Sequence, residues 1–349
     1  MHFFESLNFG SVPFMELSLV VWLLIGLALV FDFLNGMNDA ANSIATVVST
    51  RVLSPRFAVA WAAFFNFIAF LVFHLKVART IGTGIIDPDI VDNRVVAALL
   101  LGAAAWTYFC THYGLPISVS HALIGGMVGA ALVKTGISAL QWEGILKTLV
   151  FIVLSPLIGW ATGLAIAVSV TWLFRRATPR HVDGIFRRGQ LLSAALFSLG
   201  HGGGDAQKTM GIIFVLLIAN GALSREAPIP TEVVLACHVA IGLGTLAGGW
   251  AVIKTMGHRI IKLRPVDGFC AETGGAVTLA MTIFGGIPVS TTHTITGSII
   301  GVGWARHRLS AVRWGVAGRV VWAWVLTIPG AALVAALSWW LLEKTGLLS

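Results

Sequence analysis

The sequence has few charged residues for its length. Only 11% of its 349 residues are Asp, Glu, Lys or Arg, whereas 57% are hydrophobic and the mean hydropathy is +0.88. A soluble domain has about a quarter of its residues charged and about half apolar, so this composition indicates a membrane protein. The chain also lacks a charge block, a Ser/Pro linker or a repeat-rich tail that would indicate a separate soluble domain.

Cysteine is scarce as well. The chain has three cysteines and no CxxC pair, which argues against a disulfide framework and against a zinc site. The net charge of +8 does not indicate a nucleic-acid partner, because the basic residues lie in short loops between apolar runs. The apolar segment 17–34 has neither a basic stretch before it nor a cleavage site after it, so we interpret it as a first span rather than a signal peptide.

Long apolar runs recur along the chain. Because a span needs about 20 apolar residues, we expect an all-α polytopic membrane protein with about ten transmembrane helices. The count reaches 10–12 if the fourth and ninth segments are re-entrant hairpins. The expected crossings lie near residues 17–50 (broken), 57–75, 95–112, 116–133, 148–174, 190–219 (broken), 232–253, 268–285, 288–304 and 316–342.

The basic residues predict the orientation of the chain. Fourteen of the 23 Lys and Arg residues lie in four loops that we place in the cytoplasm, at 51–56, 175–188, 254–264 and 306–313. This bias places both termini outside. Five crossings precede the basic loop and five follow it, so the second half enters the membrane in the opposite sense, which predicts two inverted repeats. We divide the chain into a first repeat at 1–175, an Arg-rich cytoplasmic loop at 176–189 and a second repeat at 190–349.

Two motifs occur twice in the same order. Gly-Leu-Pro-Ile-Ser-Val-Ser-His at 114–121 recurs as Gly-Ile-Pro-Val-Ser-Thr-Thr-His at 286–293, and each copy is followed by a GxxxG spacing that suits close helix packing. Asn-Gly-Met-Asn-Asp-Ala-Ala-Asn-Ser at 35–43 aligns with His-Gly-Gly-Gly-Asp-Ala-Gln-Lys-Thr at 201–209. The offsets are 172 and 166 residues, which indicates a duplication.

The motifs predict a ligand site near the middle of the membrane. Asp39 and Asp205 are ionisable residues in otherwise apolar segments, where an unpaired carboxylate costs several kcal/mol. We expect the glycines before each aspartate to break the helix, and Pro116 and Pro288 to lie in the first turn of two further helices. Four helix starts would then present positive dipole ends and free N–H groups to a small oxyanion. The expected substrate-binding residues are Asn38, Ser118, Ser120, His121, Lys208, Thr209, Ser290, Thr291, Thr292 and His293.

Two carboxylates need another role in an anion site. They could bind a sodium ion or a proton that travels with the anion, or accept a hydrogen bond from a protonated phosphate hydroxyl, which sulfate lacks. The expected coupling-ion residues are Asp39, Asn42, Asp205 and Glu272, with sodium possible at the two aspartates. Lys208 follows Asp205 by three positions and is either an anion ligand or, as we favour, the partner of Asp205. The two motif histidines could donate to an oxyanion or relay a proton.

At these residues the sequence resembles the inorganic phosphate transporter (PiT) family, over almost the whole chain. The resemblance implies that the motif aspartates fall on Asp39 and Asp205, and that an important glutamate of some members falls on Glu272. It also implies phosphate uptake across the plasma membrane, here a bacterial inner membrane, by symport with sodium or protons or as a neutral metal–phosphate complex. Gly204 departs from the family pattern, which has Asn before this Asp. A homodimer is allowed by analogy, and no cofactor is expected.

Three other functions remain open at the level of the sequence. A permease of the same fold could carry sulfate or another small oxyanion. A membrane enzyme acting on a phosphorylated lipid would need a nucleophile–base pair, and no such triad is apparent. An ion channel would show steady flux without saturation or ion coupling. We therefore predict a transporter rather than an enzyme.

Overall fold

The described part of the chain is built from helices. The computed structural model describes residues 10, 12, 14–259, 263–307 and 313–348, so parts of the predicted cytoplasmic loops 254–264 and 306–313 lie outside it. The described residues contain no strand, only an isolated β-bridge between Ile86 and Leu140. The predicted all-α class is confirmed.

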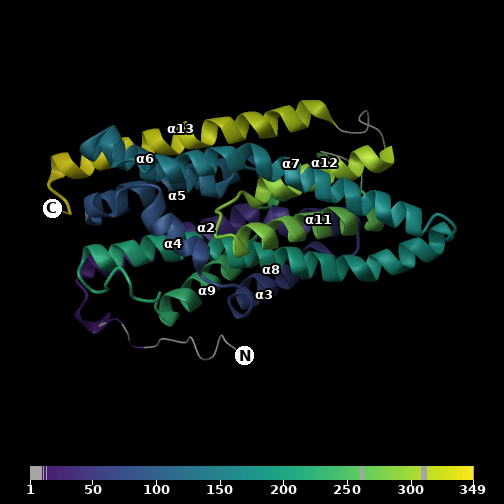
Figure 1. The fold of residues 1–349 in the computed structure, drawn as a ribbon, viewed down its shortest axis with the longest axis horizontal. Helices are drawn as coiled ribbons and strands as arrows, with labels where there is room; N and C mark the ends of the chain where they lie inside the picture. Colours follow the sequence, from purple (N-terminus) through teal and green to yellow (C-terminus); the bar gives the residue numbers. More distant parts are fainter. Residues whose placement is uncertain (1–9, 11, 13, 260–262, 308–312, 349) are drawn as a thin grey trace.

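The helices run roughly parallel along the longest axis of the molecule (Figure 1). The first half contains η1 (Phe14–Glu16), α2 (Leu19–Ser49), α3 (Pro55–Ile68), η2 (Ala69–Leu71), α4 (Lys76–Gly84), η3 (Pro88–Ile90), α5 (Asn93–His112), α6 (Val119–Thr135), η4 (Ile137–Ala139) and α7 (Trp142–Leu173). The second half contains α8 (Pro179–Ala219), α9 (Thr231–Ala247), α10 (Trp250–Arg259), α11 (Pro265–Phe284), α12 (Thr291–His307) and α13 (Trp314–Thr345).

The two aspartate motifs lie inside unbroken helices, which corrects the expected breaks at 35–43 and 201–209. α2 and α8 are continuous through the glycines of both motifs. These glycines serve close packing: a Cβ on Gly36 would lie 2.2 Å from the carbonyl oxygen of Ile241, and one on Gly202 would lie 2.4 Å from that of Asn66. Such contacts leave no room for a side chain, so these glycines are required by a helix crossing rather than by a helix end.

The breaks occur in other segments. The expected crossing at 57–75 corresponds to α3 and η2 and ends just before a sharp bend into α4, whereas the expected crossing at 232–253 is divided between α9 and α10. α3 with η2 meets α4 at 85°, and α9 meets α10 at 72°. Gly248 follows the last residue of α9 and has φ +69°, a positive value that glycine adopts without strain.

The Arg-rich segment 176–189 is mostly helical, which corrects its assignment as a loop. α8 begins at Pro179, after Thr178 as N-cap, and continues for 41 residues. Arginine is a good helix former and proline suits the first helical position, so a polar stretch can extend a membrane helix beyond the bilayer. A helix of this length spans about 60 Å, and Figure 1 shows it extending beyond its neighbours at the end where it follows α7.

The predicted GxxxG packing is confirmed in both halves. α6 lies against α13, where a Cβ on Gly129 would lie 2.1 Å from the carbonyl oxygen of Ala332. α12 lies against α7, where a Cβ on Gly301 would lie 2.2 Å from the carbonyl oxygen of Trp160. Each helix that follows a Pro-x-Ser motif therefore packs closely on the last helix of the other half.

The helices differ in how far they are buried. Among the described residues, α2, α5, α7 and α13 are each long and apolar enough to cross a membrane, and counting the two bent pairs raises the number to six. In the most apolar part of α7 only 17% of residues are buried and in α13 22%, against 67% in α5. α7 and α13 thus present apolar side chains outward, as lipid-facing helices do. The number of crossings stays a prediction, because α8 and α11 carry too many polar residues for this criterion.

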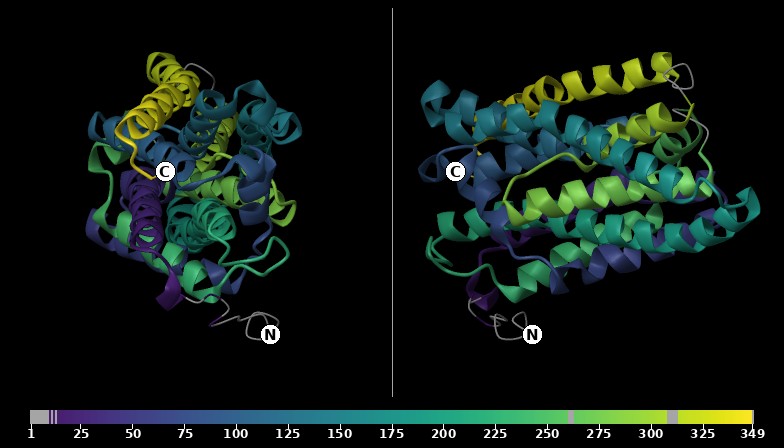
Figure 2. Two further views of the ribbon diagram at one scale, coloured as in Figure 1. Left: turned by 90° about the vertical axis from the view of Figure 1, so that its left-hand side faces the viewer. Right: turned by 45° about the vertical axis from the view of Figure 1, so that its right-hand side comes forward.

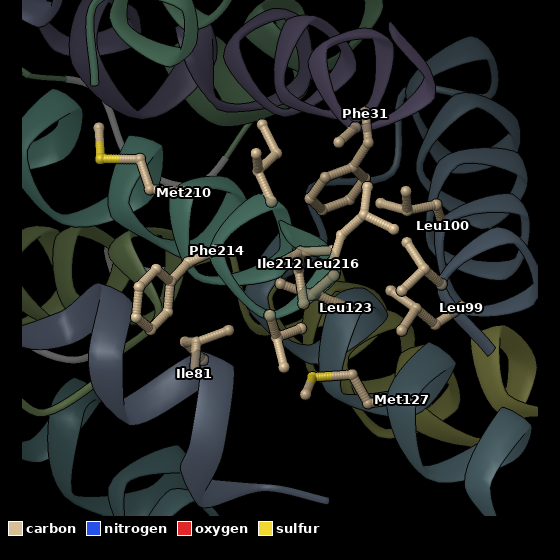
Figure 3. Close-up of a cluster of buried hydrophobic side chains, with 14 of the residues drawn as sticks. Phe31, Ile81, Leu99, Leu100, Leu123, Met127, Met210, Ile212, Phe214 and Leu216 are labelled. Carbon is tan, nitrogen blue, oxygen red and sulfur yellow. The ribbon is translucent and has the colours of Figure 1, made fainter. Parts of the chain in front are cut away.

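The interior joins the two halves. Every residue of α8 from 200 to 217 is buried. One apolar cluster contains side chains of α2, α4, α5, α6 and α8, among them Phe31, Ile81, Leu99, Met127 and Phe214 (Figure 3). The view along the helices (Figure 2, left) shows the other helices grouped around this interior. Through this cluster, the part of α8 that carries the second aspartate motif packs against helices of the first half of the chain.

Candidate functional site

The two motif aspartates lie together although 166 residues separate them. The Nε2 atom of His201 lies 3.7 Å from a carboxylate oxygen of Asp39 and 3.5 Å from one of Asp205. All three side chains are buried, and each offers one ligand atom within 4.8 Å of the others. Asp39 comes from α2, and His201 and Asp205 are one turn apart on α8. Asp39 and Asp205, which match in the alignment of the two motifs, are therefore close neighbours in the structure.

His201 was not among the predicted site residues. Its Nδ1 atom lies 3.1 Å from the side-chain oxygen of Asn66 on α3, whose amide nitrogen donates to the hydroxyl of Thr245 at 2.8 Å. These contacts orient the ring so that Nε2 faces both carboxylates. The signal was present in the sequence, because His201 aligns with Asn35 and precedes Asp205 by one helical turn.

Asp205 is paired with Lys208. The ammonium group of Lys208 donates to a carboxylate oxygen of Asp205 at 2.5 Å, to the hydroxyl of Ser120 and to the carbonyl oxygen of Val289 at 3.2 Å. Both charged side chains are buried. A buried ammonium group is stabilised only when its donors are satisfied in this way, so the ion pair is part of the site's construction.

Asp39 is surrounded by neutral donors and by the histidine. The hydroxyl of Thr291 donates to one carboxylate oxygen at 3.0 Å, and that of Thr292 lies 3.4 Å from the other. The Thr292 hydroxyl is also 2.8 Å from the carbonyl oxygen of Ile117. The amide of Asn42, one turn along α2 from Asp39, donates to Thr292 at 2.9 Å. This carboxylate has no Lys or Arg partner among the described residues.

Two helix starts meet at the site, and not the expected four, in the described part of the chain. α6 begins after Ser118 and α12 after Ser290, and each serine oxygen accepts a hydrogen bond from the backbone N–H three residues on. Pro116 and Pro288 lie two residues before these serines, outside the helices, which corrects their placement in the first turn. The two starts touch, because Ser120 donates to the carbonyl oxygen of Val289 at 3.4 Å.

The motif histidines contact each other beside these helix starts. The ring centroids of His121 and His293 are 4.7 Å apart, and the rings are nearly perpendicular. His293 also packs against Trp324 of α13, with centroids 3.7 Å apart, and its Nδ1 lies 3.3 Å from the carbonyl oxygen of Ile152 of α7. Through His293, this pair of rings connects the starts of α6 and α12 to α13 and α7.

Three predicted residues point elsewhere. Asn38 donates to the hydroxyl of Thr111 on α5 at 2.7 Å, away from the aspartates. Thr209 lies beside Asp32, another buried residue of α2. Glu272 of α11 forms a separate buried cluster, because its carboxylate accepts hydrogen bonds from residues of α2 and α8. The donors are Thr46 at 2.5 Å, Gln190 at 3.0 Å and Ser193 at 2.5 Å.

A small cavity lies on the Lys208 side of the site. It is lined by Gly204, Asp205, Lys208, Pro288, Val289 and Thr291, together with apolar residues of α4 and α11. Its volume is about 10 Å³, which is room for roughly one water molecule. The space at the site is therefore small, and it is bounded by the paired side chains of Asp205 and Lys208 and by the segment that leads into α12.

Comparison with known proteins places this geometry in a family. Residues 35–335 match the phosphate transporter family. The chain is 61% identical to a protein of Rhizobium meliloti (strain 1021) over 93% of its own length and 97% of the relative's. It is 43% identical to one of Bacillus subtilis (strain 168) over 94% and 99% of the two lengths. Both relatives are named "Probable low-affinity inorganic phosphate transporter".

A solved structure has the same fold. The protein named "The sodium-dependent phosphate transporter" superposes with a TM-score of 0.84 at 25% identity, covering 94% of this chain and all of the other. The matched proteins are transporters, so the alternative of an enzyme acting on lipid is set aside. With its apolar outer helices, the protein is a multi-pass membrane transporter, and the chain belongs to the phosphate transporter family.

Proposed function

We propose that the protein takes up inorganic phosphate across the bacterial plasma membrane by symport with a sodium ion or a proton. The observation that carries the proposal is the closed site between α2 and α8, where one carboxylate is paired with Lys208 and the other is not. An anion and a cation can bind side by side there, because the site holds the ammonium group of Lys208 and, in Asp39, a carboxylate whose neighbours are hydroxyl groups and His201. The names of the relatives supply the substrate class.

Phosphate would bind on the Lys208 side. The cavity there is lined by the ammonium group and by the segment before α12, whose first N–H groups carry positive partial charge. Since the cavity holds only about one water molecule, the starts of α6 and α12 must move away from α8 before phosphate enters. A carboxylate that accepts a hydrogen bond from a protonated phosphate oxygen would disfavour sulfate, which has no such proton.

The coupling cation would bind on the Asp39 side. The hydroxyls of Thr291 and Thr292 and the carbonyl oxygen of Ile117 provide the oxygen ligands that hard cations prefer. The sodium-dependent protein of the same fold supports sodium as this ion. A proton on Asp39 is the other candidate, and the experiment below distinguishes the two.

Alternating access would follow from two inverted repeats that move against each other. The matched packing of α6 on α13 and of α12 on α7 supports this arrangement, because each contact joins equivalent helices of opposite halves. We assign the basic loops to the cytoplasm and both termini to the outside, as the positive-inside rule predicts.

Uptake of labelled phosphate into proteoliposomes, under a sodium gradient alone and under a proton gradient alone, tests the proposal. We expect concentrative uptake with one gradient, little inhibition by excess sulfate, and loss of concentrative uptake in Asp39→Asn and Asp205→Asn. Full activity in both variants would refute the assigned ion role. Equal competition by sulfate would favour a general oxyanion permease.

A metal–phosphate complex is a second candidate cargo. Asp39, His201 and Asp205 can each offer a ligand atom within 4.8 Å of the others, which is a spacing that a divalent cation could bridge. If this cargo is correct, uptake of phosphate should require a divalent metal and carry it inward in equal amount. Phosphate uptake that is unchanged by a chelator would exclude it.

A further inference from the structure

The oxygen atoms around Asp205 form a cation-binding set with a cation already in it. The ammonium group of Lys208 contacts a carboxylate oxygen of Asp205, the hydroxyl of Ser120 and the carbonyl oxygen of Val289. These are the kinds of oxygen ligand that a small hard cation takes in a protein. The lysine side chain supplies three donors and no acceptor, so each contact uses its positive charge.

The oxygen atoms around Asp39 form the equivalent set. The Thr292 hydroxyl contacts both the carboxylate of Asp39 and the carbonyl oxygen of Ile117. Each set thus combines an aspartate of one half, a hydroxyl from the other half and the carbonyl oxygen that precedes a helix start. In the sequence alignment, Thr292 matches Ser120 and Ile117 matches Val289, both with the offset of 172 residues.

The two sets differ at the position that faces the oxygen atoms. Lys208 holds this position in the second half, and Asn42 holds it in the first. The amide of Asn42 is neutral and can turn to present its oxygen, so it can act as a cation ligand, whereas an ammonium group can only take the cation's place. His201 lies between both carboxylates and does not distinguish the two sets.

We propose that Lys208 is a tethered cation that permanently occupies one of two equivalent cation positions, so that the mobile coupling cation binds only at Asp39. Two buried carboxylates need two positive charges, because an unpaired charge away from water is costly. Lys208 supplies the charge beside Asp205, and the transported cation supplies the charge beside Asp39 when the His201 ring, 3.7 Å away, carries no positive charge. The inference rests on the proposed symport. It specifies that only one of the two cation positions, the one at Asp39, exchanges its cation during transport.

Exchanging the two side chains between the halves tests the inference. Lys208→Asn gives the second set the residue of the first, and we expect it to move one more cation per phosphate than the wild type. With the membrane voltage clamped at zero and a tenfold cation gradient, one extra cation raises the equilibrium ratio of internal to external phosphate by about tenfold, by mass action. The mirror variant Asn42→Lys places an ammonium group beside Asp39, and we expect phosphate only to equilibrate, without accumulation.

The outcomes separate this inference from the proposed function. Wild-type proteoliposomes that fail to concentrate phosphate under either gradient would refute the symport itself. A wild type that concentrates phosphate, with the same ratio in Lys208→Asn or with undiminished accumulation in Asn42→Lys, would overturn only the role of Lys208.

Binding measurements keep the test decisive if a variant folds but does not transport. The purified full-length protein in detergent is assayed for bound sodium by equilibrium dialysis, or for proton uptake with a pH indicator if protons drive the wild type. We expect one more bound cation in Lys208→Asn than in the wild type and one fewer in Asn42→Lys. Equal binding in all three proteins would overturn the inference.

Discussion

The motifs of α2 and α8 place an aspartate at matching positions but surround it with different charge. Asp39 has Asn35 one turn before it and Asn42 one turn after it, whereas Asp205 has His201 and Lys208 at the matching positions. The helices are alike in their unbroken backbones and in the glycines at their crossings. The difference teaches that two helices with matching motifs can pair one aspartate with a lysine and surround the other with hydroxyl groups and a histidine.

The strongest way to break this comparison is to remove each carboxylate in turn and measure stability. Asp205→Asn leaves the buried ammonium group of Lys208 without its charged partner, and breaking a buried pair costs about 3–5 kcal/mol. Asp39→Asn removes a charge that has no Lys or Arg partner among the described residues, so we expect a much smaller loss. Thermal unfolding of the purified protein in detergent measures both.

A double variant serves as the control. Adding Lys208→Met to Asp205→Asn removes the unpaired charge and keeps a side chain of similar length, so most of the lost stability should return. If Asp39→Asn destabilises the protein as much as Asp205→Asn does, the two carboxylates are equally paired and the contrast between the halves is wrong.

The second test concerns the glycines at close helix crossings, which α2 and α8 have in common. A methyl group on Gly36 or Gly202 would meet a backbone oxygen at 2.2 or 2.4 Å, and overpacking at such sites costs up to about 3 kcal/mol. We expect Gly36→Ala and Gly202→Ala to lower the unfolding temperature by similar amounts. Gly26→Ala on α2 is the matched control, because a Cβ there has nothing within 4 Å. A harmless substitution at Gly202 alone would show that the two crossings are not equivalent.

The sequence predicted much of this fold because the signals were repeated in it. Apolar runs predicted the helices, and GxxxG spacings predicted two close contacts that are confirmed. The alignment of the two motifs predicted that Asp39 and Asp205 share one site, and in the structure both carboxylates lie beside His201. The prediction that the helices break at the aspartate motifs was wrong, because a glycine in a membrane segment is compatible either with a helix break or with a close helix crossing. Only the partner backbone, here Ile241 and Asn66, distinguishes the two.

The rest of the site depended on side-chain direction. Asn38 was expected to bind the substrate and Glu272 the coupling ion. The structure shows that Asn38 donates to Thr111 and that Glu272 accepts from Thr46, Gln190 and Ser193. Composition identifies a polar residue in a membrane helix without showing which neighbour satisfies it. The backbone oxygens of Ile117 and Val289 have no signature in the sequence at all, since every residue carries a carbonyl group.

The smallest expected effect concerns the residue just before each aspartate, which is Asn38 in α2 and Gly204 in α8. The amide of Asn38 donates to Thr111 at 2.7 Å, so Asn38→Ala should cost about 1 kcal/mol, the net value of one hydrogen bond. A Cβ on Gly204 would meet Ile283 at an ordinary distance of 3.5 Å, so Gly204→Ala should be close to neutral in thermal unfolding.

Both variants should also keep the wild-type ratio of cations to phosphate in proteoliposomes, because the Asn38 amide donates to Thr111 and Gly204 has no side chain that could contact the oxygen atoms around the aspartates. The absence of an amide at Gly204 then removes no contact to the coupling ion. A changed ratio in Asn38→Ala would mean that this amide turns from Thr111 toward Asp39 during transport, and the difference between the halves would then extend from charge to the ligands themselves.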